Sequence, residues 1–261
     1  MDPQTLEIRI AQRVAVVWLA REKVRNAFNE TMIAELHDAF ERLGADPGVR
    51  AIVLAARGPA FCAGADLDWM RRMSTYSAEE NRRDAQHLAD MLRTIHDCPK
   101  PTIARVHGDA YAGGMGLLAA CDMAFAATGA TFCLTETRLG LIPATIGPYV
   151  IRSIGVSAAR RYMITAEKFD AAEAHRIGLV NQVVPAEELM ARTEALAGAI
   201  LSRGPLAVRC ALDAVHHGLD MPLGEGLAYE AALFSLLCAS EDMKEGTKAF
   251  LEKRKAGFRG R

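Results

Sequence analysis

The sequence has little excess charge and few aromatic residues. Its 261 residues carry a formal net charge of −1, and aromatic side chains make up 6% of the chain. Nucleic-acid binding requires a basic stripe interleaved with aromatic residues, and the sequence contains no such stripe. We therefore expect no nucleic-acid partner.

The sequence also lacks signals for secretion and membrane insertion. Residues 1–7 have neither a basic end nor an apolar segment, and no apolar run approaches the length of a membrane span. The six cysteines are scattered without metal-ligand spacing, at Cys62, Cys98, Cys121, Cys133, Cys210 and Cys238. We expect a cytoplasmic protein with buried free thiols, no bound metal and no membrane contact.

The order of apolar segments indicates an α/β protein. Residues 51–56 are apolar throughout, as expected for a strand that is covered on both faces, and residues 6–10 and 14–19 have the pattern of a hairpin. From Pro185 onward the sequence predicts only amphipathic helix. We therefore divide the chain into a core, residues 1–200, and a helical region, residues 201–261.

The functional interpretation depends mainly on residues 101–136. An apolar segment at residues 101–106 is followed by a loop of small residues, 107–116, and then by a short helix. Glycine just before a helix lets the backbone approach a ligand, and the first N–H groups of the helix have no internal acceptor. This arrangement favours a negative oxygen, which belongs either to a phosphate or to a reacting carbonyl.

A second corner of the same kind, residues 58–67, also opens onto a helix. If the N–H groups of Ala65 and Gly113 point at one place, they can stabilise enolate charge on a thioester carbonyl. A carboxylate such as Glu136 can then move a proton to or from the adjacent carbon. The histidines offer no triad, since most are predicted on helical faces, and a structural role is favoured for His107.

A dinucleotide site is the competing interpretation of the same loop. Gly114, Gly116 and Ala119 fit a relaxed dinucleotide fingerprint, and Glu136 follows Gly116 by 20 residues. However, a ten-residue loop separates strand from helix, whereas the fingerprint requires a tight turn. The dinucleotide hypothesis also leaves the corner at residues 58–67 unexplained, so we rank it below the thioester hypothesis.

Three motifs together resemble the enoyl-CoA hydratase/isomerase (crotonase) superfamily. They are residues 61–67 (Phe-Cys-Ala-Gly-Ala-Asp-Leu), residues 112–114 ahead of Cys121 and Asp122, and Glu136 ahead of residues 141–143. The resemblance covers essentially the whole chain, and residues 113–117 and 132–136 are most similar to bacterial methylglutaconyl-CoA hydratases. It implies a spiral of ββα units, a helical C-terminal region that builds trimers or hexamers, and an acyl-CoA substrate without a prosthetic group.

The resemblance also implies roles for individual residues. Ala65 and Gly113 match the two oxyanion-hole donors, and Glu136 matches the second of the two glutamates that hydratases use. The positions that match coenzyme A contacts are Lys23, Val24, Arg25, Ala63, Asp66 and Leu67, with Phe250 and Lys253 coming from a neighbouring subunit. The residues expected around the acyl group are Trp69, Met70, Gly116 and Arg138.

Two departures from the family pattern affect the predicted chemistry. Gly116 stands where two-glutamate hydratases carry their first glutamate, and residues 144–146 replace most of the glycines in the loop that follows Pro143. We expect Gly116 to leave room for water, and Asp109 or Asp122 is the candidate substitute for the missing carboxylate. Three functions stay open: hydration of a branched 2-enoyl-CoA, isomerisation of an enoyl-CoA by one glutamate, and acyl-CoA binding without catalysis.

Overall fold

The computed structural model describes residues 3–218 and 220–261. Its main sheet has six strands in the order β1-β2-β3-β4-β6-β9, and a smaller sheet has the order β5-β7-β8. In the main sheet β1 and β2 are antiparallel and all other neighbours are parallel. The strands of the main sheet are β1 (Leu6–Ala11), β2 (Val14–Leu19), β3 (Ala51–Ala56), β4 (Thr102–Val106), β6 (Met123–Ala127) and β9 (Gln182–Val184). Those of the smaller sheet are β5 (Ala110–Tyr111), β7 (Thr131–Cys133) and β8 (Phe169–Asp170).

The predicted hairpin is present at the edge of the main sheet. Gln12 and Arg13 join β1 to β2, with φ values of 48° and 66°. Positive φ at both central residues is typical of the two-residue turn whose twist matches that of paired strands. The hairpin thus brings β2 alongside β3, which begins the parallel part of the sheet.

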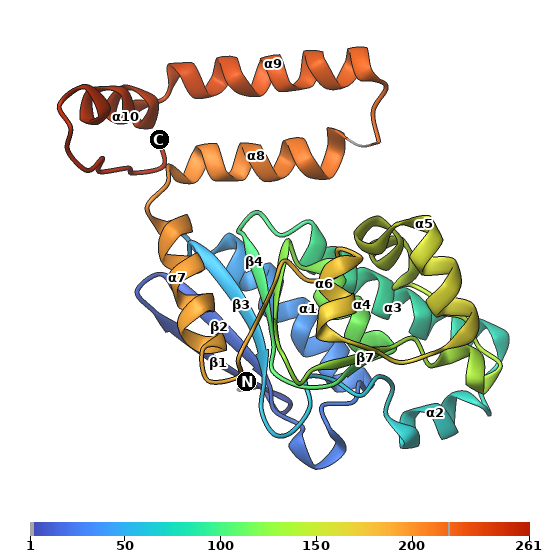
Figure 1. Ribbon diagram of the computed structural model, residues 1–261. Helices are drawn as coiled ribbons and strands as arrows, with labels where there is room; N and C mark the ends of the chain where they lie inside the picture. The colour runs from blue at the N-terminus through green and yellow to red at the C-terminus, as the bar shows by residue number, and fades with distance from the viewer. Residues whose placement is uncertain (1–2, 219) are drawn as a thin grey trace.

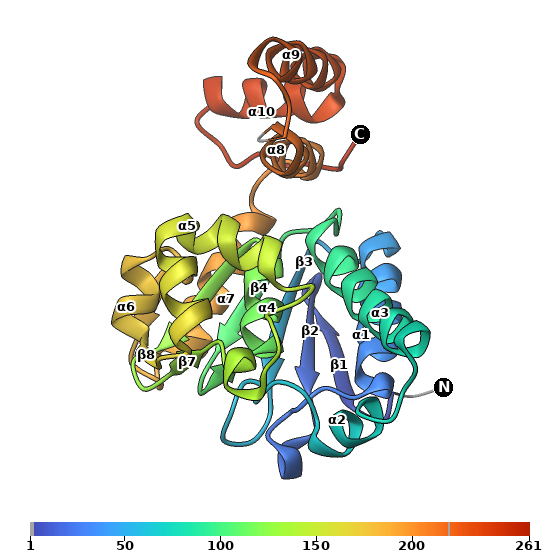
Figure 2. The ribbon, with the colours of Figure 1, turned by 90° about the vertical axis from the view of Figure 1, so that its right-hand side faces the viewer.

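Helices cover both faces of the main sheet (Figures 1 and 2). On one face, Ile52 and Leu54 of β3 belong to the large core that includes α1 (Glu30–Ala45) and α3 (Ala78–His96). On the other face, Val53 packs with Ala197 of α7 (Leu189–Leu201). Successive strand residues point to opposite faces, so the apolar run of β3 is buried on both sides.

The middle of the chain repeats a turn of two strands and a helix. β4, β5 and α4 (Gly113–Ala120) form one turn, and β6, β7 and α5 (Gly147–Thr165) form the next. In each turn the first strand joins the main sheet and the second joins the smaller one. The remaining elements of this part are η1 (Glu22–Val24), α2 (Leu67–Met73), η2 (Glu136–Leu139) and α6 (Ala171–Arg176). This arrangement is the predicted spiral of ββα units.

The last three helices form a separate layer beyond α7, as both ribbon views show (Figures 1 and 2). They are α8 (Pro205–Gly218), α9 (Leu223–Ala239) and α10 (Glu241–Leu251). None of the residues of α9 is buried, and large apolar side chains on its surface are exposed, among them Leu223, Leu227, Phe234 and Leu236. Among the described residues no single helix is long and apolar enough to cross a membrane, although α7 and α8 meet that test together across a bend of 107°.

A polar cluster fastens α8 to the core. His216 Nε2 lies 2.9 Å from Asp122 Oδ1, and the His216 ring stacks on that of His96 at 4.5 Å. The other oxygen of Asp122 accepts from the N–H and the hydroxyl of Thr102, at 2.7 and 2.8 Å. Asp122 is therefore a structural acid and does not replace the missing glutamate.

All six cysteines are free thiols, as predicted, and five of them are buried. Cys238 is partly buried. Burial raises the pKa of Cys62 to about 12, so this thiol, which lies in the corner at residues 58–67, stays protonated near neutral pH. A protonated thiol is a poor nucleophile, which argues against cysteine chemistry at this corner.

Candidate active site

The two backbone corners, residues 58–66 and 107–113, lie against each other. The Cys62 N–H donates to the Asp109 carbonyl at 3.1 Å, and the Tyr111 N–H donates to the Cys62 carbonyl at 2.9 Å. These bonds join segments that are about 50 residues apart in the sequence and fix the direction in which each corner points.

The N–H groups of Ala65 and Gly113 are left free by this arrangement. Ala65 pairs with Phe28 as an isolated bridge, but the bridge uses the carbonyl of Gly64 and the N–H of Asp66, at 2.7 and 2.8 Å. Gly113 is the first residue of α4, where a helix has no internal acceptor for the N–H. Within the described part of the chain neither N–H donates a hydrogen bond.

The residue before Gly113 is held in a conformation that side chains rarely adopt. Ala112 has φ 48° and ψ −121°, and it precedes α4 without a side-chain cap. Its N–H donates to the Cys133 carbonyl of β7 at 2.8 Å, which holds the strained residue in place. Such strain is typical of sites where a backbone group must point in one direction, here the N–H of Gly113.

The glycines of α4 serve close packing. A Cβ on Gly113 would lie 2.3 Å from Phe28 Cε2, and a Cβ on Gly114 would lie 2.5 Å from the Cys62 carbonyl oxygen. Gly114 and Gly116 are therefore covered by protein and do not form an open turn around a pyrophosphate. The dinucleotide interpretation is wrong.

Glu136 supplies the carboxylate of the site. It begins η2 just after β7, its Oε2 atom is buried without a hydrogen-bond partner, and no cation of the described chain pairs with it. Burial raises the pKa of the Glu136 carboxyl, although a bond from its own backbone N–H opposes the change. A raised carboxyl pKa, closer to neutral pH, suits a group that takes up and releases a proton.

The amino-acid sequence matches a known protein family. The family model described as Enoyl-CoA hydratase/isomerase matches residues 9–261. The chain belongs to the enoyl-CoA hydratase/isomerase family. It is accordingly an enzyme of this family, and the match extends from the first strand to the end of the C-terminal helices.

Individual relatives cover nearly the whole chain. The crotonyl-CoA hydratase of Syntrophomonas wolfei is 39% identical over 249 residues, which are 95% of each chain. The short-chain-enoyl-CoA hydratase of Clostridium acetobutylicum is 35% identical over 252 residues, again 95% of each. The crystal structure of the Mycobacterium smegmatis enoyl-CoA hydratase superposes with a TM-score of 0.93 at 34% identity, covering 97% of this chain and 98% of that one. The predicted crotonase-like fold is confirmed.

The loop that the family resemblance assigns to coenzyme A lies beside the two corners. Lys23, Val24 and Arg25 are exposed, and the Arg25 carbonyl accepts from the Ala63 N–H at 3.0 Å. The Arg25 guanidinium pairs with Asp109 at 2.6 Å. The loop is thus attached to both corners, although its contacts with coenzyme A stay predictions.

The other predicted coenzyme A contacts lie in two separate places. Asp66 caps α2 and pairs with Arg21 at 2.9 Å, while the neighbouring Leu67 is 76% exposed. Phe250 is 84% exposed at the end of α10, and Lys253 follows it. Both ribbon views place α10 at the opposite end of the molecule from α2 (Figures 1 and 2). A tail contact to coenzyme A therefore requires a second subunit.

Two residues expected around the acyl group are engaged elsewhere. The Trp69 side chain is part of the main core, and its indole N–H donates to Asp84 at 3.3 Å. Arg138 donates to the carbonyl of Ala166 at the end of α5. Met70 is half-buried, and the roles of Trp69, Met70 and Arg138 at the acyl group stay predictions.

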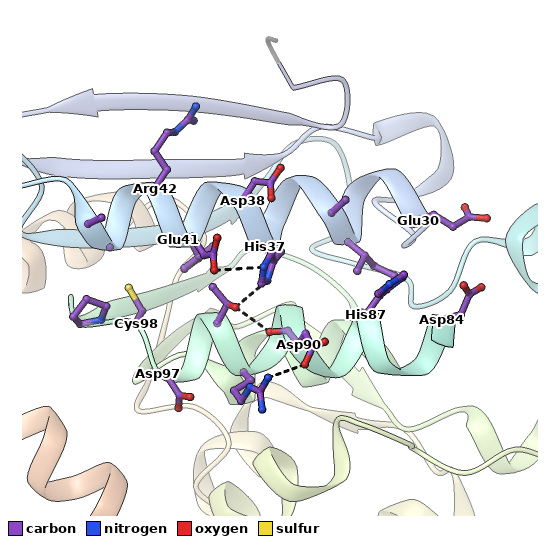
Figure 3. A pocket seen from close by; sticks show the side chains of 18 of the residues that line it. Glu30, His37, Asp38, Glu41, Arg42, Asp84, His87, Asp90, Asp97 and Cys98 are labelled. Carbon is purple, nitrogen blue, oxygen red and sulfur yellow. Dashed lines mark hydrogen bonds and ion pairs between the residues drawn. The ribbon is translucent and has the colours of Figure 1, made fainter. Parts of the chain in front are cut away.

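A groove with a volume of about 1260 Å³ runs between α1 and α3 (Figure 3). Trp69 is one of the residues that line it. Polar side chains in it satisfy one another, as His37 and Thr94 do at 2.9 Å. Neither Ala65 nor Glu136 lines this groove.

The prediction that Gly116 leaves room for water is wrong. A Cβ on Gly116 would lie 2.1 Å from Cγ2 of Ile146, the residue that precedes α5. Ile146 is 1% exposed and occupies the position next to the glycine. An apolar side chain from the loop therefore fills the space that a glutamate on α4 would need.

Asp109 does not replace the missing glutamate either. One of its oxygens accepts from Arg25 at 2.6 Å, and the other accepts from the Thr131 hydroxyl at 2.7 Å. Both oxygens of Asp109 thus serve contacts that join the loop at Arg25 to β7.

Sequence reasoning missed two residues beside the site, Ala112 and Ile146. Ala112 has no sequence signal, because alanine rarely adopts positive φ. Ile146 did have a signal, the loss of glycine from residues 144–146, but the contact that explains it comes from a different element, α4.

Proposed function

We propose that this protein hydrates 2-enoyl-CoA thioesters. The observation that carries the proposal is the combination of two free backbone N–H groups on adjoining corners, at Ala65 and Gly113, with one half-buried carboxylate, Glu136, whose Oε2 atom is buried without a partner. This is the minimum set that enolate chemistry on a thioester requires.

In the proposed reaction the two N–H groups bind the thioester oxygen. They stabilise the negative charge that develops there when water attacks carbon 3. Glu136 takes a proton from the water and delivers a proton to carbon 2, so the carboxylate is regenerated and one water is consumed. Burial raises the pKa of the Glu136 carboxyl, which makes the carboxylate a stronger base than one in water.

The test is a comparison of three substrates. The protein is incubated with crotonyl-CoA, methylglutaconyl-CoA and a 3-enoyl-CoA, and the products are identified by mass spectrometry and chromatography. Formation of 3-hydroxyacyl-CoA from either 2-enoyl substrate supports hydration. Binding of all three thioesters without any product would contradict it.

Isomerisation is the second candidate, because only one carboxylate is present. An isomerase removes a proton from one carbon and returns it to another, which a single glutamate can do. Conversion of the 3-enoyl-CoA to a 2-enoyl-CoA, with no 3-hydroxyacyl-CoA formed, would favour this function.

For the acyl group we propose a branched, methylglutaconyl-like chain. Support comes from residues 113–117 and 132–136, which resemble the methylglutaconyl-CoA hydratases, and from the absence of glutamate at Gly116. A kcat/KM for methylglutaconyl-CoA that is at least about tenfold above that for crotonyl-CoA is expected, a difference of about 1.4 kcal/mol in transition-state binding.

We further propose a cytoplasmic homotrimer or a hexamer of two trimers. The supporting features are the exposed apolar side chains of α9 and the position of α10, far from the loop at residues 22–25. Light scattering at micromolar concentration tests the assembly, and a stable monomer would contradict it.

A further inference from the structure

Hydration requires polar groups that hold the reacting water, and α4 has no polar side chain. Gly116 has no side chain, and the adjacent space is filled by Ile146, whose Cγ2 would lie 2.1 Å from an added Cβ. Ile146 is apolar and cannot bind water. Any second polar contact must therefore come from another part of the site.

The residue before Ile146 has two unusual features. Thr145 has φ 66°, a conformation that is rare for β-branched residues and costs energy. Its Oγ1 atom is buried and has no hydrogen-bond partner. A strained backbone and an unsatisfied buried hydroxyl at one residue are both unfavourable for folding, so a functional role would explain why they occur together.

Only two side-chain polar atoms in the described ranges are buried without a partner, and they are Thr145 Oγ1 and Glu136 Oε2. One short loop connects the two residues. It is closed at its start by a bond from the Leu141 N–H to the Glu136 carbonyl at 3.0 Å, and near its end by a bond from the Ile146 N–H to the Ala144 carbonyl at 2.8 Å. The contact of Ile146 with α4 then fixes where the loop ends.

We propose that the Thr145 hydroxyl is a second water-binding group of the active site and holds the reacting water together with Glu136. The inference rests on the proposed hydration of 2-enoyl-CoA at this site. A hydroxyl can both donate to and accept from a water molecule, so a single water within reach of both atoms would satisfy them together.

Thr145 and Glu136 have different roles because a hydroxyl and a carboxyl differ in acidity. A threonine hydroxyl does not ionise near neutral pH, so Thr145 orients the water and does not take its proton. Glu136 accepts one water proton while the oxygen forms the bond to carbon 3, and it gives a proton to carbon 2. The carbon–carbon double bond is consumed, one C–O and one C–H bond form, and Glu136 returns to its ionised state.

The test compares Thr145→Val with Thr145→Ser. Valine keeps the branched shape and the backbone strain but removes the hydroxyl, whereas serine keeps the hydroxyl. We expect Thr145→Val to lower kcat for hydration about 10- to 100-fold with KM changed less than about twofold, since the acyl-CoA contacts remain. Thr145→Ser should keep kcat within about threefold of the wild type.

A stability measurement separates this role from a structural one. Because the Thr145 hydroxyl bonds no other protein group, Thr145→Val should leave Tm within roughly 2–4 °C of the wild type while activity falls. Thr165→Val is the matched control: this hydroxyl donates to the Arg161 carbonyl at 2.9 Å on an exposed part of α5, and its loss should leave kcat unchanged.

Three outcomes would overturn the inference. The first is a folded Thr145→Val protein with wild-type kcat while the wild type hydrates 2-enoyl-CoA. The second is a parallel loss of Tm, kcat and substrate binding that serine does not restore, which would make Thr145 structural. The third is a wild type that hydrates no 2-enoyl-CoA, which would overturn the proposed function as well.

Discussion

The contact between Gly116 and Ile146 predicts the effect of adding a single methyl group. In Gly116→Ala the new Cβ would lie 2.1 Å from Ile146 Cγ2, so the isoleucine would have to move by about 1.3 Å to reach ordinary contact. Overpacking of this kind costs about 1–3 kcal/mol. A contact of 2.1 Å lies at the severe end of this range, about 2–3 kcal/mol, and the higher helix propensity of alanine offsets up to about 1 kcal/mol, so the net loss should be about 1–2 kcal/mol.

The assay is thermal and urea unfolding of four variants. A net loss of 1–2 kcal/mol lowers Tm by about 2–8 °C for a chain of this size. Gly198→Ala is the matched control, since Gly198 lies within α7 and an added Cβ there has no neighbour within 4 Å; it should stabilise the protein slightly. Gly116→Ala combined with Ile146→Ala should be about 0.5–3 kcal/mol more stable than the sum of the single changes predicts. The reasoning is refuted if Gly116→Ala stabilises like the control, or if the two changes are additive.

The remaining predictions concern the oxyanion hole and two titrating regions. Ala65→Pro deletes one N–H donor and should lower kcat about 10²–10³-fold, whereas Ala65→Ser keeps the N–H and should stay active. Equal activity of the two variants in steady-state kinetics would contradict this. Hydration requires the ionised form of Glu136, and burial raises the pKa of this carboxyl, so kcat/KM should rise with pH through a midpoint above the ordinary 4.5; a midpoint at or below 4.5 would be inconsistent with it. At the C-terminal end of α8, burial and the neighbouring His216 lower the pKa of His96, while the bond to Asp122 raises the pKa of His216. The cluster should therefore stabilise the fold most near pH 6.5. Its contribution to the free energy of unfolding is lost as pH falls through the His96 pKa and as pH rises through the His216 pKa. A Tm difference between wild type and His216→Gln that does not vary with pH would disprove this.

The parts of the fold that follow from local chemistry were predictable from the sequence. Ser77 and Glu80 form the expected capping box at the start of α3, and Asn29 caps α1 through the Met32 N–H at 2.9 Å. His107 bonds the Gly58 carbonyl at 2.8 Å, a structural contact as expected. The two caps depend on residues a few positions apart, which sequence patterns report directly, whereas the partner of His107 lies 49 positions away in the other corner.

The features that sequence did not reveal depend on contacts between distant segments. The strain at Ala112 is maintained by β7, and the environment of Gly116 is set by Ile146, 30 positions away. Arg25 and Asp109 pair across 84 positions, which removes Asp109 from the candidate bases. Such pairings follow from the packing of whole elements, and a missing side chain in the sequence does not indicate what fills its space.

The site could be outlined from sequence because two of its three parts are backbone. Oxyanion donors need a corner of small residues and a helix start, and both corners have that composition. The third part, Glu136, was identified by its position relative to these corners. The water site was misjudged because an absent side chain was taken as empty space.

The measurement that tests the central claim most directly is the hydration of 2-enoyl-CoA by Glu136→Gln beside the wild type. The amide keeps the shape of the carboxyl but cannot carry a proton, so kcat should fall about 10²–10⁴-fold. Binding of the saturated acyl-CoA, measured by calorimetry, should change less than about threefold, because the backbone N–H groups of Ala65 and Gly113 are unaffected. A folded Glu136→Gln protein that hydrates the substrate at the wild-type rate would contradict the account.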